Sequence, residues 1–224
     1  MAVTLTGTNN AVAVLYQSNG DNPATITNSA VLNGGVYTFG LQFWTITNAG
    51  YITSGSGADG VIITNGGIFT NEASGTIVAN QTGIYTGGTV DSTVVNAGSI
   101  SNLSLYQVAV DLYRGGTLTN LSSGRITNTS TRTVRSGGAY QLAVTNAGLI
   151  QNLSTTGQAI DVGAGGNVTN QASGTIAGHY AIFANSATVN GASTLVNAGI
   201  VQGQTDGAGV RFLHGGSVVN LSSG

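Results

Sequence analysis

Residues 144–150 read VTNAGLI and residues 168–176 read VTNQASGTI, nearly the same phrase with two residues inserted after the asparagine. The phrase recurs along most of the chain, and an asparagine preceded two positions earlier by a large apolar residue anchors each copy. Successive anchors are 23, 25, 24, 26, 24, 27 and 23 residues apart. Self-similarity at such a period is the signature of a repeat architecture. The anchors are Asn48, Asn71, Asn96, Asn120, Asn146, Asn170, Asn197 and Asn220.

The link that follows the anchor alternates between two forms. Asn48, Asn96, Asn146 and Asn197 are followed directly by Ala-Gly. The other four anchors carry a longer link, as in NEASGTI at 71–77 and NQASGTI at 170–176. The full period is therefore about 50 residues, built from two similar halves. The last copy, NLSSG at 220–224, stops before the isoleucine that ends the earlier copies, so we expect the array to be truncated in mid-repeat.

Apolar and polar residues alternate before each anchor, which is the pattern of a half-buried β-strand. The position one before the anchor is Thr or Val, which suits the solvent face of a strand. The position two before the anchor is always apolar, so we expect this column to face a core. The column is Ile46, Phe69, Val94, Leu118, Val144, Val168, Leu195 and Val218.

The period fits a β-solenoid better than it fits two alternatives. A leucine-rich repeat needs leucines at several fixed offsets, and a propeller blade would not explain the half-period phrase. A solenoid needs about three short strands per coil and corners rich in Gly and Asn, and this chain offers both. We therefore predict one all-β solenoid of parallel strands, with 23–27 residues per coil and eight to nine coils. Stacked asparagines can bond along its axis, like the amide ladders of cross-β structures.

Residues 1–44 keep the phrase poorly and are expected to form irregular N-terminal capping coils, with the regular array at 45–224. Around this boundary lies a dense group of aromatic residues. They would cover the first coil, whose core would otherwise be exposed, or alternatively form a stacking platform for sugar rings. The group consists of Tyr37, Phe39, Phe43, Trp44 and Tyr51.

The composition argues against several classes of function. The chain has 12 charged residues among 224 and a net charge of −2, so it lacks the basic surface that nucleic acids require. No run of 18 apolar residues predicts a transmembrane helix, and the opening residues show no signal peptide. The absence of cysteine excludes disulfides and thiolate metal sites.

Ionisable residues are too scattered to predict an active site. Asp111 and Asp161 each lie nine residues before their anchor, and Arg211 has the same offset before Asn220. The two aspartates would share one face in alternate coils, about 10 Å apart, which is long for a retaining glycosidase pair. His179 and His214 fall in different coils without carboxylates at a ligand-like interval. We therefore expect no catalytic residue, no metal site and no cofactor.

The strings VTNAGLI, GAGGNVTNQASGTIAG (163–178) and LVNAGIV (195–201) resemble passenger segments of bacterial autotransporter and adhesin-type proteins. The resemblance covers about residues 45–224 and rests on repeats rather than on an active-site motif. It implies a right-handed parallel β-helix displayed at the bacterial cell surface. The expected function is a structural or adhesive rod segment without catalysis, with a host surface or glycan as partner, or with other copies through stacking or lateral association. The alternatives are a subunit of an end-to-end filament and a polysaccharide-acting β-helix enzyme.

Overall fold

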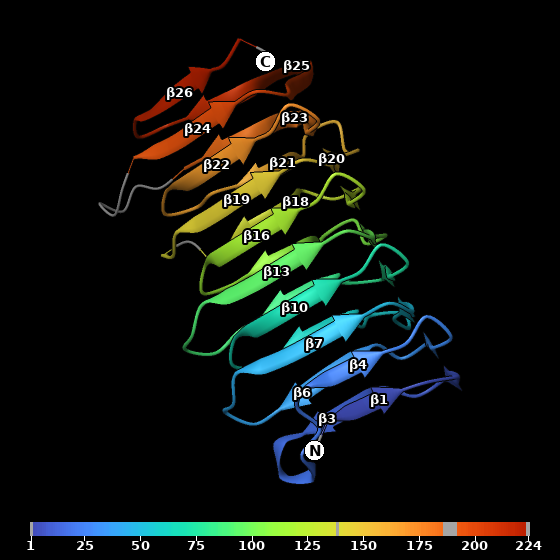
Figure 1. Ribbon diagram of the computed structural model, residues 1–224. Helices are drawn as coiled ribbons and strands as arrows, with labels where there is room; N and C mark the ends of the chain where they lie inside the picture. The colour runs from blue at the N-terminus through green and yellow to red at the C-terminus, as the bar shows by residue number, and fades with distance from the viewer. Residues whose placement is uncertain (1, 138, 186–191, 223–224) are drawn as a thin grey trace.

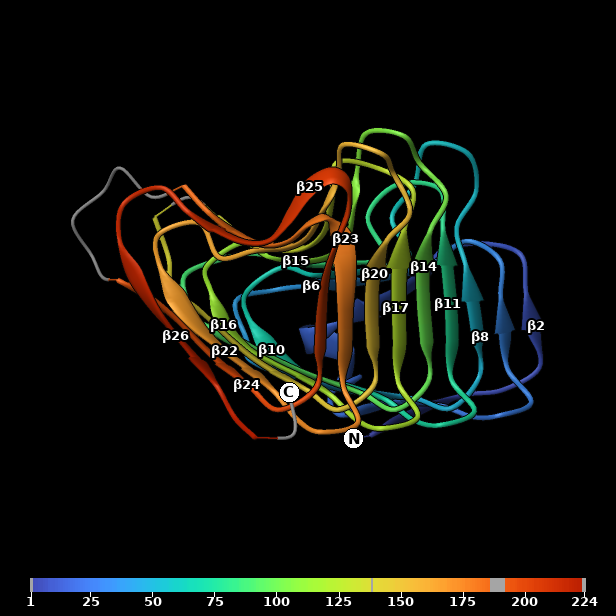
Figure 2. The same cartoon turned by 90° about the horizontal axis from the view of Figure 1, so that it is seen from above.

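The computed structural model describes residues 2–137, 139–185 and 192–222. In these residues the chain winds as a single parallel β-solenoid with three strands in most coils (Figures 1 and 2). About nine coils are complete, and the last strand begins another. Seen from the C-terminal end, the chain circulates anticlockwise as it rises toward the viewer, so the helix is right-handed. The predicted fold class and its three strands per coil are confirmed.

Three faces enclose the core. The first face is a ten-stranded sheet: β1 (Val3–Leu5), β4 (Ala24–Ile26), β7 (Trp44–Asn48), β10 (Gly67–Asn71), β13 (Ser92–Asn96), β16 (Gly116–Asn120), β19 (Leu142–Asn146), β22 (Gly166–Asn170), β24 (Ser193–Asn197) and β26 (Gly216–Asn220). The second face holds β2 (Thr8–Asn9), β5 (Val31–Leu32), β8 (Tyr51–Thr53), β11 (Thr76–Ala79), β14 (Ser99–Asn102), β17 (Arg125–Asn128) and β20 (Leu149–Asn152).

The third face holds β3 (Ala13–Tyr16), β6 (Val36–Phe39), β9 (Val61–Ile63), β12 (Ile84–Thr86), β15 (Val108–Leu112), β18 (Arg132–Ser136) and β21 (Gln158–Asp161). Two long strands, β23 (Thr175–Ala184) and β25 (Ile200–Phe212), pass around the corner from the second face to the third. One 3-10 turn, η1 (Gln17–Asn19), follows β3.

The N-terminal segment continues the solenoid rather than interrupting it. Residues 1–44, expected to be irregular, contribute β1 to β6, and these strands pair in parallel with the coils above them. These coils differ from the later ones in residue type and not in strand arrangement. Leu5 and Ile26 stand in register with Asn48, so the first two coils carry an aliphatic residue where later coils carry the anchor.

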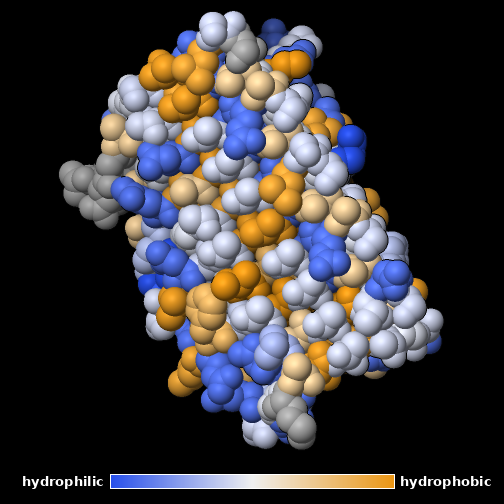
Figure 3. All heavy atoms as spheres, in the orientation of Figure 1, coloured by the Kyte–Doolittle hydropathy of each residue, from blue (hydrophilic) through white to orange (hydrophobic). Residues whose placement is uncertain are grey.

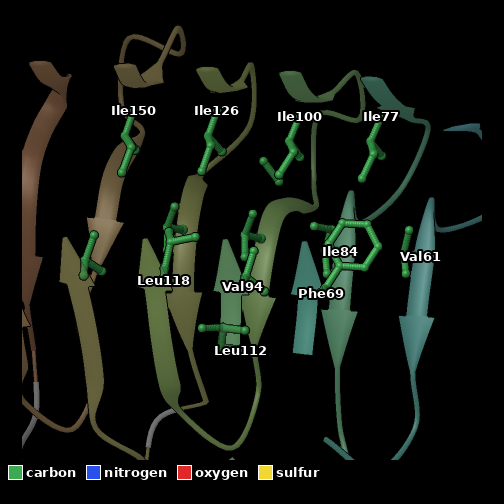
Figure 4. Packing of buried hydrophobic residues seen from close by; sticks show 14 of the residues in the cluster. Val61, Phe69, Ile77, Ile84, Val94, Ile100, Leu112, Leu118, Ile126 and Ile150 are labelled. Atoms are coloured by element: carbon green, nitrogen blue, oxygen red, sulfur yellow. The ribbon is translucent and has the colours of Figure 1, made fainter. Parts of the chain in front are cut away.

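The predicted core column points inward, because alternate residues of a strand lie on opposite faces of its sheet. Its members from Ile46 to Leu195 are at most 2% exposed, and complete burial of such a side chain stabilises the fold by about 1.5–3 kcal/mol. Val218 is the exception. It is 53% exposed because β26 pairs only with β24 and no further described coil covers it. The second face adds a row of its own, in which Ile77, Ile100, Ile126 and Ile150 follow one another along the solenoid axis, seen as a row across Figure 4.

The outward positions of the first face are mostly half-buried Thr and Val, as predicted. Figure 3, in the same view as Figure 1, shows pale, weakly polar residues with apolar and strongly hydrophilic ones scattered among them.

The two link types meet at the corner after the first face. The serine of each longer link donates a hydrogen bond to the alanine carbonyl of the shorter link in the coil before it. The three bonds are Ser74 Oγ to Ala49 O at 2.8 Å, Ser123 Oγ to Ala97 O at 2.7 Å and Ser173 Oγ to Ala147 O at 2.8 Å. In the last long link, Ser223 and Gly224 lie outside the described residues. The period of about 50 residues is therefore a pair of coils joined by a side-chain bond.

Candidate functional site

The predicted asparagines form one continuous column, here called the axial ladder. Each side-chain Nδ2 donates to the Oδ1 of the asparagine in the next coil, from Asn48 to Asn220, over 2.7–2.9 Å. From Asn48 to Asn197, each Nδ2 also donates to a glycine carbonyl of its own link, as Asn146 does to Gly148 at 3.1 Å. Every ladder member except Asn220 is buried. Buried amides satisfied in this way rigidify a core, whereas a lost partner would be costly.

A second column of buried asparagines was missed by the sequence reasoning. Asn102, Asn128 and Asn152 pair in register at the end of the second face. Each Oδ1 accepts the backbone N–H two residues later, as from Ser104 at 2.6 Å and Ser154 at 2.9 Å. The recurring Asn-x-Ser at this corner was the available signal. These asparagines fix the turn toward the third face, as Asx turns do.

The candidate acids lie on the third face, and each is bonded to an arginine. Arg135 Nε and Nη2 both donate to Asp111 Oδ2, at 2.9 and 2.6 Å. Arg132 Nε donates to Asp161 Oδ2 at 2.6 Å. Arg132, Arg135 and Asp161 border a hollow of about 230 Å³, whereas Asp111 does not line it. Because each carboxylate is bonded to a cation, neither is placed as a proton donor for a glycosidic oxygen.

Arg135 stands between the two aspartates in the register, a placement that the sequence reasoning missed. It lies eleven residues before its anchor, whereas each aspartate lies nine before. The coil that contains Arg135 has 26 residues, with its extra length before β19. Counting nine residues back from each anchor therefore finds the two aspartates but misses Arg135, the cation that lies between them in the register.

Burial raises the pKa of Asp111, which is only 2% exposed, and the bond to Arg135 opposes that rise without cancelling it. Burial also acts to lower the pKa of Arg135, but the hydrogen bond and charge of Asp111 outweigh it and raise the pKa. Burial raises the pKa of the Tyr85 hydroxyl, and the nearby Asp111 charge adds to the effect. Asp111 Oδ1 is buried and has no hydrogen-bond partner among the described residues.

The remaining charged candidates do not converge. Arg211 donates from Nη1 to the Tyr180 hydroxyl at 2.8 Å, and its guanidinium lies 5.1 Å from the centre of that ring. His179 packs edge-on against Tyr180, while His214 is exposed. No group of three His, Asp or Glu residues in the described ranges could hold a metal ion. In the same ranges, no helix has the length and apolar character needed to span a bilayer.

The aromatic residues grouped near residue 44 in the sequence lie on different faces of the solenoid. Trp44 is fully buried in the first face, and Tyr51 is on the second. Phe39 and Tyr37 lie on the third face, with ring centres 4.8 Å apart.

Tyr16, which the sequence reasoning overlooked, stacks on Phe39 at 5.5 Å with 17° between the ring planes. Its signal was the strand AVLY at 13–16, placed 23 residues before VYTF at 36–39. The two rings border a hollow of about 470 Å³, here called the aromatic hollow, lined by Tyr16, Gln17, Ser18, Phe39, Gly40 and Gln42.

Comparisons with protein-family models, curated proteins and solved structures find no match to this chain.

Proposed function

We propose that this chain is a structural and adhesive rod segment of an exported bacterial surface protein, acting by display and contact without catalysis. The observation that carries the proposal is the unbroken axial ladder from Asn48 to Asn220. It adds buried side-chain bonds to strand pairing on all three faces. Side-chain bonds repeated from the third coil onward, together with strand pairing in every coil, resist bending and local opening, which suits a spacer that holds other surfaces apart.

The ionisable residues support contact rather than chemistry. The two acids that share a face are each bonded to an arginine, and the chain has only 12 charged residues to place. A surface of Thr, Ser, Asn and Gly with few charges can contact a neutral partner without desolvating many ions. The resemblance of the repeat phrases to autotransporter and adhesin-type passengers supports placing this contact outside the cell, with a host surface or glycan as partner.

A filament of stacked copies is a second candidate, favoured by the uncovered strand β26 and by the exposure of Val218 at that end. An unpaired parallel strand is a template for another chain. The ladder position weighs against simple head-to-tail stacking, because Leu5 of the next copy would oppose Asn220 in the same register. An aliphatic residue there would interrupt the ladder at every junction.

The experiment compares beads coated with the folded protein and beads coated with an Asn120→Ala, Asn146→Ala variant whose ladder is broken. Both bead types are applied to mammalian epithelial cells under shear flow, and retained beads are counted. We expect only the folded protein to retain beads. Equal retention of both bead types, or none for either, would refute adhesion by the rod. Sedimentation that grows with protein concentration would favour the filament, and release of reducing sugar from a polysaccharide would favour an enzyme.

A further inference from the structure

We propose that the aromatic hollow binds a neutral saccharide, with a sugar ring resting against the Tyr16 and Phe39 rings. The inference depends on the proposed contact function and specifies the ligand class and the place of contact. The hollow has about 470 Å³, within the range of roughly 300–1,000 Å³ usual for small-molecule sites. It lies where the third face turns toward the first in the first two coils.

The two rings form a fixed and exposed apolar surface. Tyr16 and Phe39 are the last residues of β3 and β6 and are direct partners in the parallel register. They are 43% and 45% exposed. Strand pairing holds both backbones, so little side-chain freedom is lost when a ligand rests against the rings. An aromatic face offers negative charge density to the weakly positive C–H groups of a sugar ring, and it buries them.

The polar residues of the hollow suit hydroxyl groups. Gln17 and Gln42 each bring an amide that can both donate and accept, and Ser18 brings a hydroxyl, so each can match the dual character of a sugar hydroxyl. The Gln17 amide has no hydrogen-bond partner among the described residues, and Gln42 accepts one bond from Asn22 Nδ2 at 3.5 Å. Asn22 also donates to the carbonyl of Phe43 at 2.8 Å, which anchors this side of the hollow.

Gly40 completes the hollow and is needed there. Its φ of +113° lies in the region that favours glycine, and an added Cβ would lie 2.8 Å from Gln17 Oε1. Any larger residue would therefore displace the glutamine that lines the hollow.

Charge favours an uncharged ligand. None of the six lining residues is an aspartate, glutamate, histidine, lysine or arginine, and the nearby Asp21 carboxylate accepts the backbone N–H of Tyr16 at 2.9 Å. A sulfated or uronic polysaccharide would find no cation in the lining, and a basic peptide would find no carboxylate in it. Proline-rich peptides also use aromatic grooves, so they are included in the test as a competing ligand.

Native electrophoresis in gels containing dextran, laminarin or mannan tests the proposal, with polygalacturonate as the acidic comparison and a decaproline peptide assayed by calorimetry. We expect at least one neutral polysaccharide to retard the protein. Tyr16→Ala and Phe39→Ala should each weaken that binding by roughly tenfold, as loss of an aromatic contact does. Gln17→Ala should weaken it to a smaller extent, and Tyr16→Phe should retain it because the ring remains.

Tyr106→Ala is the matched control, since Tyr106 is 82% exposed and lies outside the hollow. Unchanged melting temperatures would show that the variants are folded. The proposal is overturned if no neutral polysaccharide binds, if only polygalacturonate or decaproline binds, or if Tyr16→Ala and Tyr106→Ala behave alike. Bead adhesion that persists in the Tyr16→Ala protein would leave the rod function intact and place its contact elsewhere.

Discussion

Replacing Asn146 by alanine removes the middle of the axial ladder. The Asn146 side chain is fully buried, accepts a bond from Asn120 Nδ2 at 2.8 Å and donates to Asn170 Oδ1 at 2.9 Å. It also donates to Gly148 O at 3.1 Å. These three hydrogen bonds at about 1 kcal/mol each, plus about 1–3 kcal/mol for buried partners left unsatisfied, give an expected loss of about 4–6 kcal/mol. The lower end applies if Asn120 keeps its bond to the carbonyl of its own link.

Guanidinium unfolding measures this loss by circular dichroism and by the fluorescence of Trp44, the only tryptophan. Trp44 lies in β7, four strands along the first face from β19, so separate transitions by the two probes would show that the array divides at the mutated coil. Thr145→Ala is the control, because its half-buried side chain faces outward from the same strand and should cost within about 0.5 kcal/mol. A similar loss for both variants, or less than about 1 kcal/mol for Asn146→Ala, would contradict a stabilising ladder.

Val168→Asp places a carboxylate in the core and should cost about 3–5 kcal/mol, whereas Thr169→Asp on the exposed side should cost under about 1 kcal/mol. Equal denaturation midpoints would mean that the inside and outside are wrongly assigned. Gly75→Ala sets a Cβ 2.5 Å from a backbone carbonyl of the preceding coil and should lower stability by about 1–3 kcal/mol. Gly55→Ala, with no atom within 4 Å of its Cβ, should lie within about 0.5 kcal/mol of the parent by urea unfolding. Burial raises the pKa of Asp111 above 3.8, so its ionised form lowers stability, and this cost disappears as pH falls through the folded-state pKa toward 3.8. The unfolding free energy of the parent, relative to an Asp111→Asn variant, should therefore rise over that range, and urea titrations giving a flat or falling difference would contradict it.

The fold could be predicted because the repeated phrase indicates both the number of residues per coil and which side chains face the core. The distance between asparagines equals one turn, and the apolar residue two positions before each asparagine fixes which side faces the core. The same rule fails at the ends. The first two coils substitute Leu5 and Ile26 for asparagine, so a search by anchor overlooks coils whose geometry is regular. Val218 has the right pattern, but no further coil covers it among the residues that the structure describes.

The sites were harder to predict because they depend on alignment between coils of unequal length. Arg135 meets Asp111 only because extra residues before β19 shift the register of the third face relative to the anchor. Tyr16 contacts Phe39 because β3 and β6, although unlike in sequence, are paired in register as neighbouring strands of the third face. Such contacts depend on which strands pair and in which register, and the number of residues in one coil does not determine either.

The serine bonds that join a longer link to the shorter link before it have a consequence for how the molecule could be lengthened or shortened. A coil boundary placed between two bonded coils, such as those of Ala49 and Ser74, leaves a serine hydroxyl and an alanine carbonyl without each other. A boundary placed between two such pairs of coils leaves these bonds intact. Excision or duplication should thus destabilise the protein less in even numbers of turns than in odd ones. The unit by which the protein is best lengthened would then be a pair of coils rather than a single coil.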